Sequence, residues 1–518
     1  MQLEAVTDLT SDDRTETPVR AKSDRPLVPD FDVLVTADEA WPAFERAVLA
    51  ANREIIAGFR IFDMTTKLRS PEARAVGEDW FDLLADALRR GVEVTLVVTD
   101  FDPVMGTELH ELSWRTVRQG AALAEAAGVV GTNQLQVRAT LHPAKPGALP
   151  WIALLPALLR KKWDRMKNIS RARLDRQAVR LDVGSLPEIH TVTHHQKLAV
   201  MDGEILYVGG LDLNERRYDS PAHDQPAAQT WSDVQVILKG PEARDARAHL
   251  LCFENLCGGK ATPGALPGIK RTLSCPRRFQ LPFLSPRTLL SEIEEAHLSA
   301  FREARHLVYV ETQFLRSGVV ADALAEAGTR NPDLTLFFVL PALPEDVAFE
   351  GNEELDARYG LSLERDAMNT LRQAFGDRVT FSSPVRPVMA ARDTRAVLAG
   401  SPIIYVHNKV LVRDDDYGLV GSANLNGRSM RWDTEVAVEL KTPDRVARLR
   451  EKLFQHWWFD PLPEEARDPK TLQTRWAAEV RRNGVCLPEN RSGFLVPYDK
   501  GQGAELVQPL PGVTENVV

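Results

Sequence analysis

The feature that most constrains the fold of this chain is a motif segment that occurs twice. The first copy reads HHQKLAVMDGEILYVGGLDLNERR from residue 194, and the second reads HNKVLVRDDDYGLVGSANLNGRS from residue 407. Each copy contains a His, a Lys two positions later and an Asp five positions after that Lys. His195 and His407 lie 212 residues apart, a period far too long for an array of short repeats. The spacing therefore predicts two homologous halves.

Helix-like and strand-like stretches alternate in both halves. The predicted elements are helix 40–51, strand 54–62, helix 80–90, strand 92–98, helix 289–305, strand 306–311, helix 319–327 and strand 334–340. Alternation of this kind predicts α/β layers around largely buried sheets. Composition shifts divide the chain into a polar mobile arm (1–26), a first lobe (27–256) with an insertion at about 135–184, a Gly- and Pro-rich linker (257–286), a second lobe (287–462) and a C-terminal extension (463–518).

The composition is that of a soluble globular protein, with 44% hydrophobic and 26% charged residues. A net charge of −9 disfavours a nucleic-acid partner. We also expect the protein to be a monomer. The N-terminus lacks the features of a Sec signal peptide, and the apolar stretch 151–159 is too short to span a bilayer. We therefore expect a cytoplasmic or peripheral membrane protein, although secretion without a cleaved signal also fits the sequence.

The repeated motif has the residues needed for chemistry at a phosphodiester. Residues i and i+2 of a strand face the same way, so His195 projects beside Lys197, and His407 beside Lys409. One imidazole can attack phosphorus while the other protonates the leaving oxygen, and two ammonium groups can hold the phosphoryl oxygens. His194 faces the other way, which indicates a structural role. No cluster of metal ligands is evident in either half, so the sequence predicts cleavage through a phosphohistidine without metal or other cofactor.

Several further stretches support a specific family. HHQKLAVMD, YVGGLDL and RRYD in the first half, and VHNKVLVRDD, GSANLNGRSM and DTEVAVEL in the second, resemble the phospholipase D superfamily, most closely its eukaryotic-type phospholipases D. FDLLADALRRGVEVTLVVTDFDP and VYVETQFL extend the resemblance over most of residues 30–460. It implies two α/β/α sandwich lobes related by a pseudo-twofold axis, with a single active site at their interface.

The resemblance also implies roles for individual residues. It makes His195 the nucleophile and His407 the general acid, although the sequence itself is symmetric and does not order them. Lys197 and Lys409 match the lysines that hold phosphate. Ser422 and Asn424 match residues that help to hold phosphate, and the first half has Gly210 and Asp212 in their places. Glu435 matches the carboxylate that orients its histidine, and Asp233 stands at the comparable place in the first half. The motif residues Asp202 and Asp414 are expected to brace their turns.

Two departures from the family pattern are visible. Ser232 stands where the closest relatives often have a histidine, and no lipid-binding regulatory domain is recognisable before residue 30. The insertion combines a basic and an apolar stretch. Residues 160–180 include nine basic and two acidic residues, and they follow the apolar stretch 151–159. The segment 151–180 could therefore lie in a phospholipid membrane surface, or form an ordinary amphipathic helix packed on the lobe with a solvated basic face.

The predicted function is a phospholipase D that hydrolyses the head-group phosphodiester of phosphatidylcholine-type glycerophospholipids to phosphatidate and a free alcohol. Transphosphatidylation is open to the same intermediate when an alcohol replaces water. A cardiolipin synthase-like phosphatidyl transferase and a non-lipid phosphodiesterase or nuclease are the alternatives. The sequence does not determine the head group.

Overall fold

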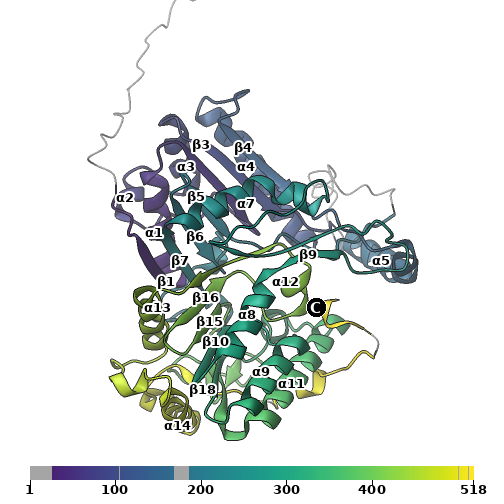
Figure 1. The fold of residues 1–518 in the computed structure, drawn as a ribbon. Helices are drawn as coiled ribbons and strands as arrows, with labels where there is room; N and C mark the ends of the chain where they lie inside the picture. Colours follow the sequence, from purple (N-terminus) through teal and green to yellow (C-terminus); the bar gives the residue numbers. More distant parts are fainter. Residues whose placement is uncertain (1–25, 104–105, 169–185, 500, 512, 518) are drawn as a thin grey trace, which may run out of the picture.

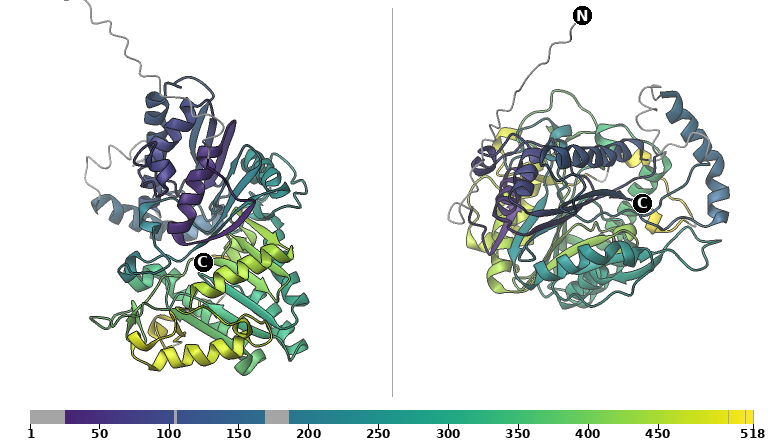
Figure 2. Two further views of the ribbon diagram at one scale, coloured as in Figure 1. Left: turned by 90° about the vertical axis from the view of Figure 1, so that its left-hand side faces the viewer. Right: turned by 90° about the horizontal axis from the view of Figure 1, so that it is seen from above.

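The computed structural model describes residues 26–518 apart from 104–105, 169–185, 500 and 512, with Val518 also left out. It contains two large mixed sheets, one in each half of the chain, with helices packed on them (Figures 1 and 2). The predicted α/β class with two lobes is confirmed, while a pseudo-twofold relation between the lobes stays a prediction. Nearly all of the predicted N-terminal arm lies outside the described residues.

The strands of the first sheet lie in the order β1-β7-β6-β5-β2-β3-β4, and those of the second in the order β18-β12-β11-β10-β15-β16-β17-β8-β9. The first sheet consists of β1 (Phe31–Val35), β2 (Glu54–Phe59), β3 (Glu93–Thr99), β4 (Leu135–Thr140), β5 (Leu198–Met201), β6 (Ile205–Gly209) and β7 (Val234–Lys239). The second consists of β8 (Lys270–Cys275), β9 (Arg287–Ser291), β10 (Leu307–Thr312), β11 (Thr335–Val339), β12 (Val379–Pro384), β15 (Lys409–Arg413), β16 (Tyr417–Gly421), β17 (Glu435–Leu440) and β18 (Leu495–Pro497). A short pair, β13 (Val397–Leu398) with β14 (Ser401–Pro402), stands apart.

The two sheets share a run of six strands with the same order and directions. The run is β7-β6-β5-β2-β3-β4 in the first sheet and β17-β16-β15-β10-β11-β12 in the second. In both runs the first three pairings are antiparallel and the last two are parallel. Each repeated motif therefore occupies the same place in its sheet.

Helices pack on both faces of the sheets. The main helices of the first half are α1 (Thr36–Ala50), α2 (Pro71–Arg74), α3 (Trp80–Arg89), α4 (Thr107–Ala126), α5 (Ala148–Asn168) and α7 (Pro241–Cys257). Those of the second are α8 (Glu292–Glu303), α9 (Gly318–Arg330), α10 (Glu345–Phe349), α11 (Leu355–Phe375), α12 (Gly427–Arg431), α13 (Pro443–His456) and α14 (Leu472–Val485). In the first half α1 and α3, and in the second half α8, α9 and α11, cover the outer faces, whereas α7, α13 and α14 contribute to the core between the sheets. Among the residues that the structure describes, no helix combines the length and hydropathy needed to cross a membrane.

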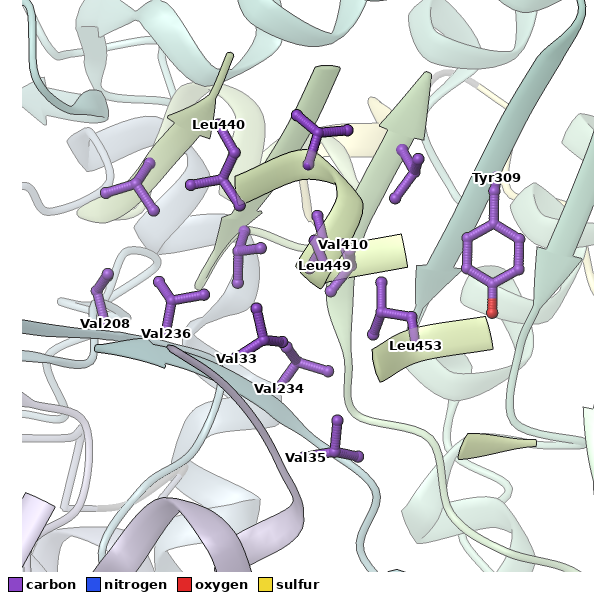
Figure 3. Close-up of a cluster of buried hydrophobic side chains, with 14 of the residues drawn as sticks. Val33, Val35, Val208, Val234, Val236, Tyr309, Val410, Leu440, Leu449 and Leu453 are labelled. Atoms are coloured by element: carbon purple, nitrogen blue, oxygen red, sulfur yellow. The ribbon is translucent and has the colours of Figure 1, made fainter. Parts of the chain in front are cut away.

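The inner faces of the two sheets pack into one hydrophobic core (Figure 3). Side chains alternate along each strand, so Val234, Val236 and Leu238 of β7 enter this core while Ile237 enters the cluster under α1 and α3. The second sheet and α13 contribute to the same core through Val410, Leu440, Leu449 and Leu453. The lobes are therefore joined by packing, not only by the chain that connects them.

Strand pairing corrects three predicted domain boundaries. β4 pairs with β3, so the insertion predicted from about 135 begins only after Thr140. β8 lies within the predicted linker but pairs with β17 of the second sheet. β18 lies within the predicted C-terminal extension but pairs with β12, so that extension is part of the second lobe. β4 and β18 lie at sheet edges, and β8 pairs with a strand far away along the chain, so the sequence pattern alone does not reveal their partners.

Candidate active site

The two motif segments reach the site as extended chain at the start of β5 and β15. His195 and Lys197 precede β5, which begins at Leu198, whereas Lys409 is the first residue of β15. The predicted first strand thus starts later than its motif, but the alternation holds. Lys197 Nζ donates to the backbone oxygen of His195 at 2.6 Å, and Lys409 makes the same bond to His407. Both lysines are buried and remain beside the histidines of their own motifs.

Backbone hydrogen bonds between the halves set the two histidines in place. The His195 N–H donates to the Thr434 oxygen at 2.9 Å, and the His407 N–H donates to the Ser232 oxygen at 2.8 Å. Isolated parallel bridges extend both contacts, from His194 to Thr434 and from Ser232 to Val406. Each motif segment therefore runs beside the residue that precedes the carboxylate of the opposite half.

The carboxylates orient the histidines crosswise. His195 Nδ1 lies 2.9 Å from Glu435 Oε1, and His407 Nδ1 lies 2.6 Å from Asp233 Oδ2. Both carboxylates are fully buried, so these contacts are shielded from water. A carboxylate on Nδ1 fixes the imidazole tautomer and leaves Nε2 free for chemistry. Neither active histidine has its partner within its own half, a pairing that the sequence did not reveal.

The polar residues predicted to hold phosphate differ between the halves. Ser422 donates its hydroxyl to Glu435 and so supports the carboxylate that binds His195. Asn424 is buried, and its Oδ1 has no hydrogen-bond partner among the described residues. In the first half, a Cβ on Gly210 would lie 2.2 Å from Asp233 Oδ1, so no serine fits there. Among the described residues, the side-chain oxygen of Asn424 is thus one of several buried polar atoms near the site without a partner, with Ser232 Oγ and Asn408 Oδ1.

The motif aspartates contact a neighbouring strand, not a histidine. Asp202 and Asp414 both adopt left-handed backbone conformations, with φ of 58° and 49°, in the hairpin turns after β5 and β15. Each carboxylate accepts backbone N–H groups at the start of the adjacent strand, β2 or β10; the donors are Asn52, Arg53 and Glu54 for Asp202, and Arg305, His306 and Leu307 for Asp414. These contacts correspond to turn bracing.

Trp231 and Arg217 lie beside His407, and neither was predicted from the sequence as a site residue. The Trp231 ring centroid lies 4.6 Å from that of His407, and the Arg217 guanidinium lies 3.6 Å from the Trp231 ring. Glu345 pairs with Arg217, while its backbone N–H donates to the Tyr405 hydroxyl. No comparable ring contacts His195 among the described residues. The only sequence signal was TWSDV, in which Trp231 stands two positions before Asp233.

Arg60 also lies at the site, and no motif in the sequence predicted it. It directly follows β2, and its guanidinium lies 5.3 Å from the Phe101 ring. The next residue, Ile61, donates its N–H to Asp212 Oδ1 at 3.0 Å, which places Arg60 beside the glycine-rich end of the first motif. Among the described residues, no carboxylate lies within 4 Å of the Arg60 guanidinium. Burial lowers the pKa of the nearby His195 imidazole, and the positive charge of Arg60 helps to lower it further.

Burial shifts the ionisation of the whole cluster. Loss of solvation lowers the pKa of His195 and of His407 well below 6.5, and it lowers the pKa of Lys409 to about 7. The same cause raises the pKa of Asp233 to about 7 and that of Glu435 to about 8. Among the described residues no three His, Cys, Asp or Glu side chains are arranged to hold a metal ion. The structure thus brings two histidines, two lysines and two carboxylates together, while their roles in catalysis stay predictions.

The sequence of this chain is similar to those of known phospholipases D. A family model described as "Cardiolipin synthase, PLD-like domain" matches residues 368–458. Human phospholipase D1 is 24% identical over 357 residues, covering 54% of this chain and 32% of that protein. Phospholipase D alpha 1 of Arabidopsis thaliana is 24% identical over 458 residues, covering 62% of this chain and 56% of that protein. The chain spans about a third of the length of bovine phospholipase D2, which it matches at 23% identity over 37% of that protein.

The crystal structure of phosphatidylserine synthase from Haemophilus influenzae is also similar, with a TM-score of 0.47 and 11% identity over 88% of this chain and 94% of that one. The curated relatives and the family model agree with the two complete His-x-Lys-x4-Asp motifs of this sequence. These matches support a place for the chain in the phospholipase D superfamily, at low sequence identity.

Proposed function

We propose that this chain is a phospholipase D that cleaves the head-group phosphodiester of phosphatidylcholine-type glycerophospholipids. The observation that carries the proposal is the pair of buried histidines, each held at Nδ1 by a carboxylate and each beside a lysine. Such a site offers two free Nε2 atoms and two ammonium groups to one phosphodiester. Asn424 is buried as well, and its side-chain Nδ2–H groups can donate a further hydrogen bond to a phosphoryl oxygen.

The reaction follows in two displacements. His195 Nε2 attacks phosphorus, the bond from phosphorus to the head-group oxygen breaks, and His407 gives that oxygen a proton. Water then attacks the phosphohistidine with His407 as the base, the N–P bond breaks, and phosphatidate leaves. The His195 side chain is 13% exposed and that of His407 is 6% exposed, which supports His195 as the nucleophile.

The acid step needs a proton that the cluster can hold. Asp233 has its pKa raised to about 7 by burial, and it lies 2.6 Å from His407. The pair Asp233–His407 therefore keeps one shared proton up to about pH 7, although burial lowers the pKa of the imidazole itself. A bound phosphodiester adds negative charge and favours that proton on the imidazole, where it can be transferred.

A second candidate is phosphatidyl transfer to an alcohol acceptor. The description of the family model that matches residues 368–458 names a cardiolipin synthase, and this candidate shares the same phosphohistidine. The two activities differ only in whether water or an alcohol reaches the intermediate.

The test incubates the purified protein with phosphatidylcholine vesicles, ethanol and a chelator, and identifies lipid products by mass spectrometry. Phosphatidate and phosphatidylethanol are expected, and both should disappear in His195→Ala. His306→Ala is the matched control: only the backbone N–H of His306 contacts the motif residue Asp414, so removal of its imidazole should leave product formation unchanged. Phosphatidylglycerol vesicles without added alcohol distinguish the transferase, which would join two phosphatidylglycerol molecules into cardiolipin and release glycerol. Absence of product from every lipid would overturn the proposal.

A further inference from the structure

The outer face of α5 is apolar where a surface helix is ordinarily polar. Figure 1 shows α5 at the right-hand margin, and the right panel of Figure 2 shows it projecting from the body. Five of its exposed apolar residues are spaced three or four apart and so form one stripe along the helix: Leu149, Ile152, Pro156, Leu159 and Trp163. Ile152 is 57% exposed and Trp163 is 60% exposed, which are large values for such side chains.

The opposite face of α5 is already attached to the protein. Leu158 and Lys162 are buried, and Trp151 donates its indole N–H to the Pro187 oxygen at 2.9 Å. Lys161 pairs with Glu354 of the second lobe at 3.3 Å. The orientation of α5 is therefore fixed from both lobes, and its apolar stripe faces solvent as a result.

The loop between β8 and β9 extends the apolar stripe. It exposes Phe279, Leu281 and Phe283, and the first of these is 64% exposed. The Gly147 N–H donates to the Phe283 oxygen at 2.7 Å, and the Leu149 N–H donates to the Leu281 oxygen at 3.1 Å. A Cβ on Gly147 would lie 1.9 Å from the Gln280 oxygen, so this contact requires glycine. We call the five stripe residues and these three loop residues the composite surface.

Basic side chains accompany the composite surface. The sequence of α5 contains five basic residues and one acidic residue. Arg160 and Lys167 are exposed, and Lys167 Nζ lies 5.3 Å from the centre of the Trp163 ring. An apolar stripe with Trp and Phe, bordered by exposed cations, has the chemistry of a surface that enters the interface of an anionic bilayer.

We propose that the composite surface docks on an anionic phospholipid bilayer and holds the active site at the lipid. This inference rests on the proposed function and names the partner of that same site. The segment that receives the Trp151 hydrogen bond leads from Pro187 directly to His195, so the docking helix and the predicted nucleophile share a short connection. The stripe covers 15 residues, from Leu149 to Trp163, and its 14 helical rises amount to about 21 Å, enough for a continuous contact with lipid.

The test measures sedimentation with vesicles of phosphatidylcholine alone and of phosphatidylcholine mixed with phosphatidylglycerol. We expect Ile152→Ser/Trp163→Ser and Phe279→Ser/Leu281→Ser each to lower binding about tenfold or more, because two apolar side chains leave the interface. Arg160→Glu/Lys167→Glu should remove only the preference for phosphatidylglycerol. Lys161 and Lys162 are poor targets, since one is ion-paired across the lobes and the other is buried. Val485→Ser/Leu487→Ser, at the exposed end of α14, is the matched control and should bind like wild type.

Turnover of a monomeric phosphodiester, bis-p-nitrophenyl phosphate, separates the two proposals. Lost vesicle binding with unchanged turnover supports docking, and unchanged binding in all surface variants overturns it whatever the turnover. Surface-dependent binding by a wild-type protein that turns over no phosphodiester overturns the proposed function instead. A wild-type dimer that the serine variants convert to a monomer, measured by light scattering, would assign the composite surface to a second copy and overturn lipid docking.

Discussion

At the scale of single residues, the crosswise pairing makes a sharp prediction. Glu435 belongs to the second half but holds His195 of the first, so Glu435→Gln should favour the wrong tautomer of His195. We expect kcat to fall by about 10³-fold or more. In ¹⁵N NMR spectra the ring nitrogens of His195 should shift while those of His407 remain in place. Asp233→Asn should give the mirror result, and a shift confined to the histidine of the mutated half would contradict the pairing.

The ionisation of the site predicts how anion binding depends on pH. Lys409 has its pKa lowered to about 7, and Asp233 has its pKa raised to about 7. As the pH rises through 7, the lysine loses its positive charge and the carboxyl gains a negative one, so both changes weaken binding of an oxyanion. Inhibition by vanadate should therefore weaken steeply between about pH 6 and 8. The slope should become shallower in Lys409→Met, and an unchanged slope in that variant would contradict the assignment.

The sequence predicted which residue types meet at the site but not how they pair. Spacing within each motif was sufficient to place each histidine beside its lysine, because that relation is local to an extended chain. The contact between His195 and Glu435 joins residues 240 positions apart, and it depends on how the lobes dock. Arg60 and Trp231 were missed for the same reason, since neither lies in the repeated segment.

At the scale of elements, the motif aspartates act as braces between neighbouring strands. Asp414 is buried and accepts three backbone N–H groups at the start of β10, so Asp414→Ala leaves three donors without a charged partner. We expect a loss of about 3 kcal/mol in the free energy of unfolding, measured by urea denaturation. The control Asp416→Ala removes an exposed carboxylate from Arg413, which keeps its second partner Glu303, and should cost less than about 1 kcal/mol. Equal losses would contradict the bracing role.

Element prediction succeeded where the signal was local. The helix predicted at 80–90 is α3, whose first turn is capped by Asp79 and whose end precedes Gly91 at φ 87°. The edge strands β4 and β18 and the strand β8, which lies between β17 and β9, were missed because each is defined by its partners in the sheet. The outward orientation of α5 likewise could not be read from its apolar periodicity, because a stripe facing solvent and one facing the core have the same spacing.

At the scale of the whole molecule, catalysis depends on the junction between the lobes. The core shown in Figure 3 joins β1, β6 and β7 of the first sheet to β15, β17 and α13 of the second. Both imidazole–carboxylate pairs cross the same junction. Neither half therefore contains a complete site, because separation of the lobes would remove the orienting carboxylate from both histidines together.

The shared core predicts that the described lobes unfold as one unit. Leu449 on α13 is fully buried in this core, so Leu449→Ala should lower the free energy of unfolding by about 2–5 kcal/mol. Calorimetry should show a single transition that moves to lower temperature. Leu324→Ala, in the cluster outside the second sheet, should move that same transition. Two transitions, with Leu324→Ala moving only one, would show independent lobes. If the lobes are one unit, activity should be lost over the same temperature range as the calorimetric transition. Both histidine–carboxylate contacts cross the junction between the lobes and break when the lobes separate.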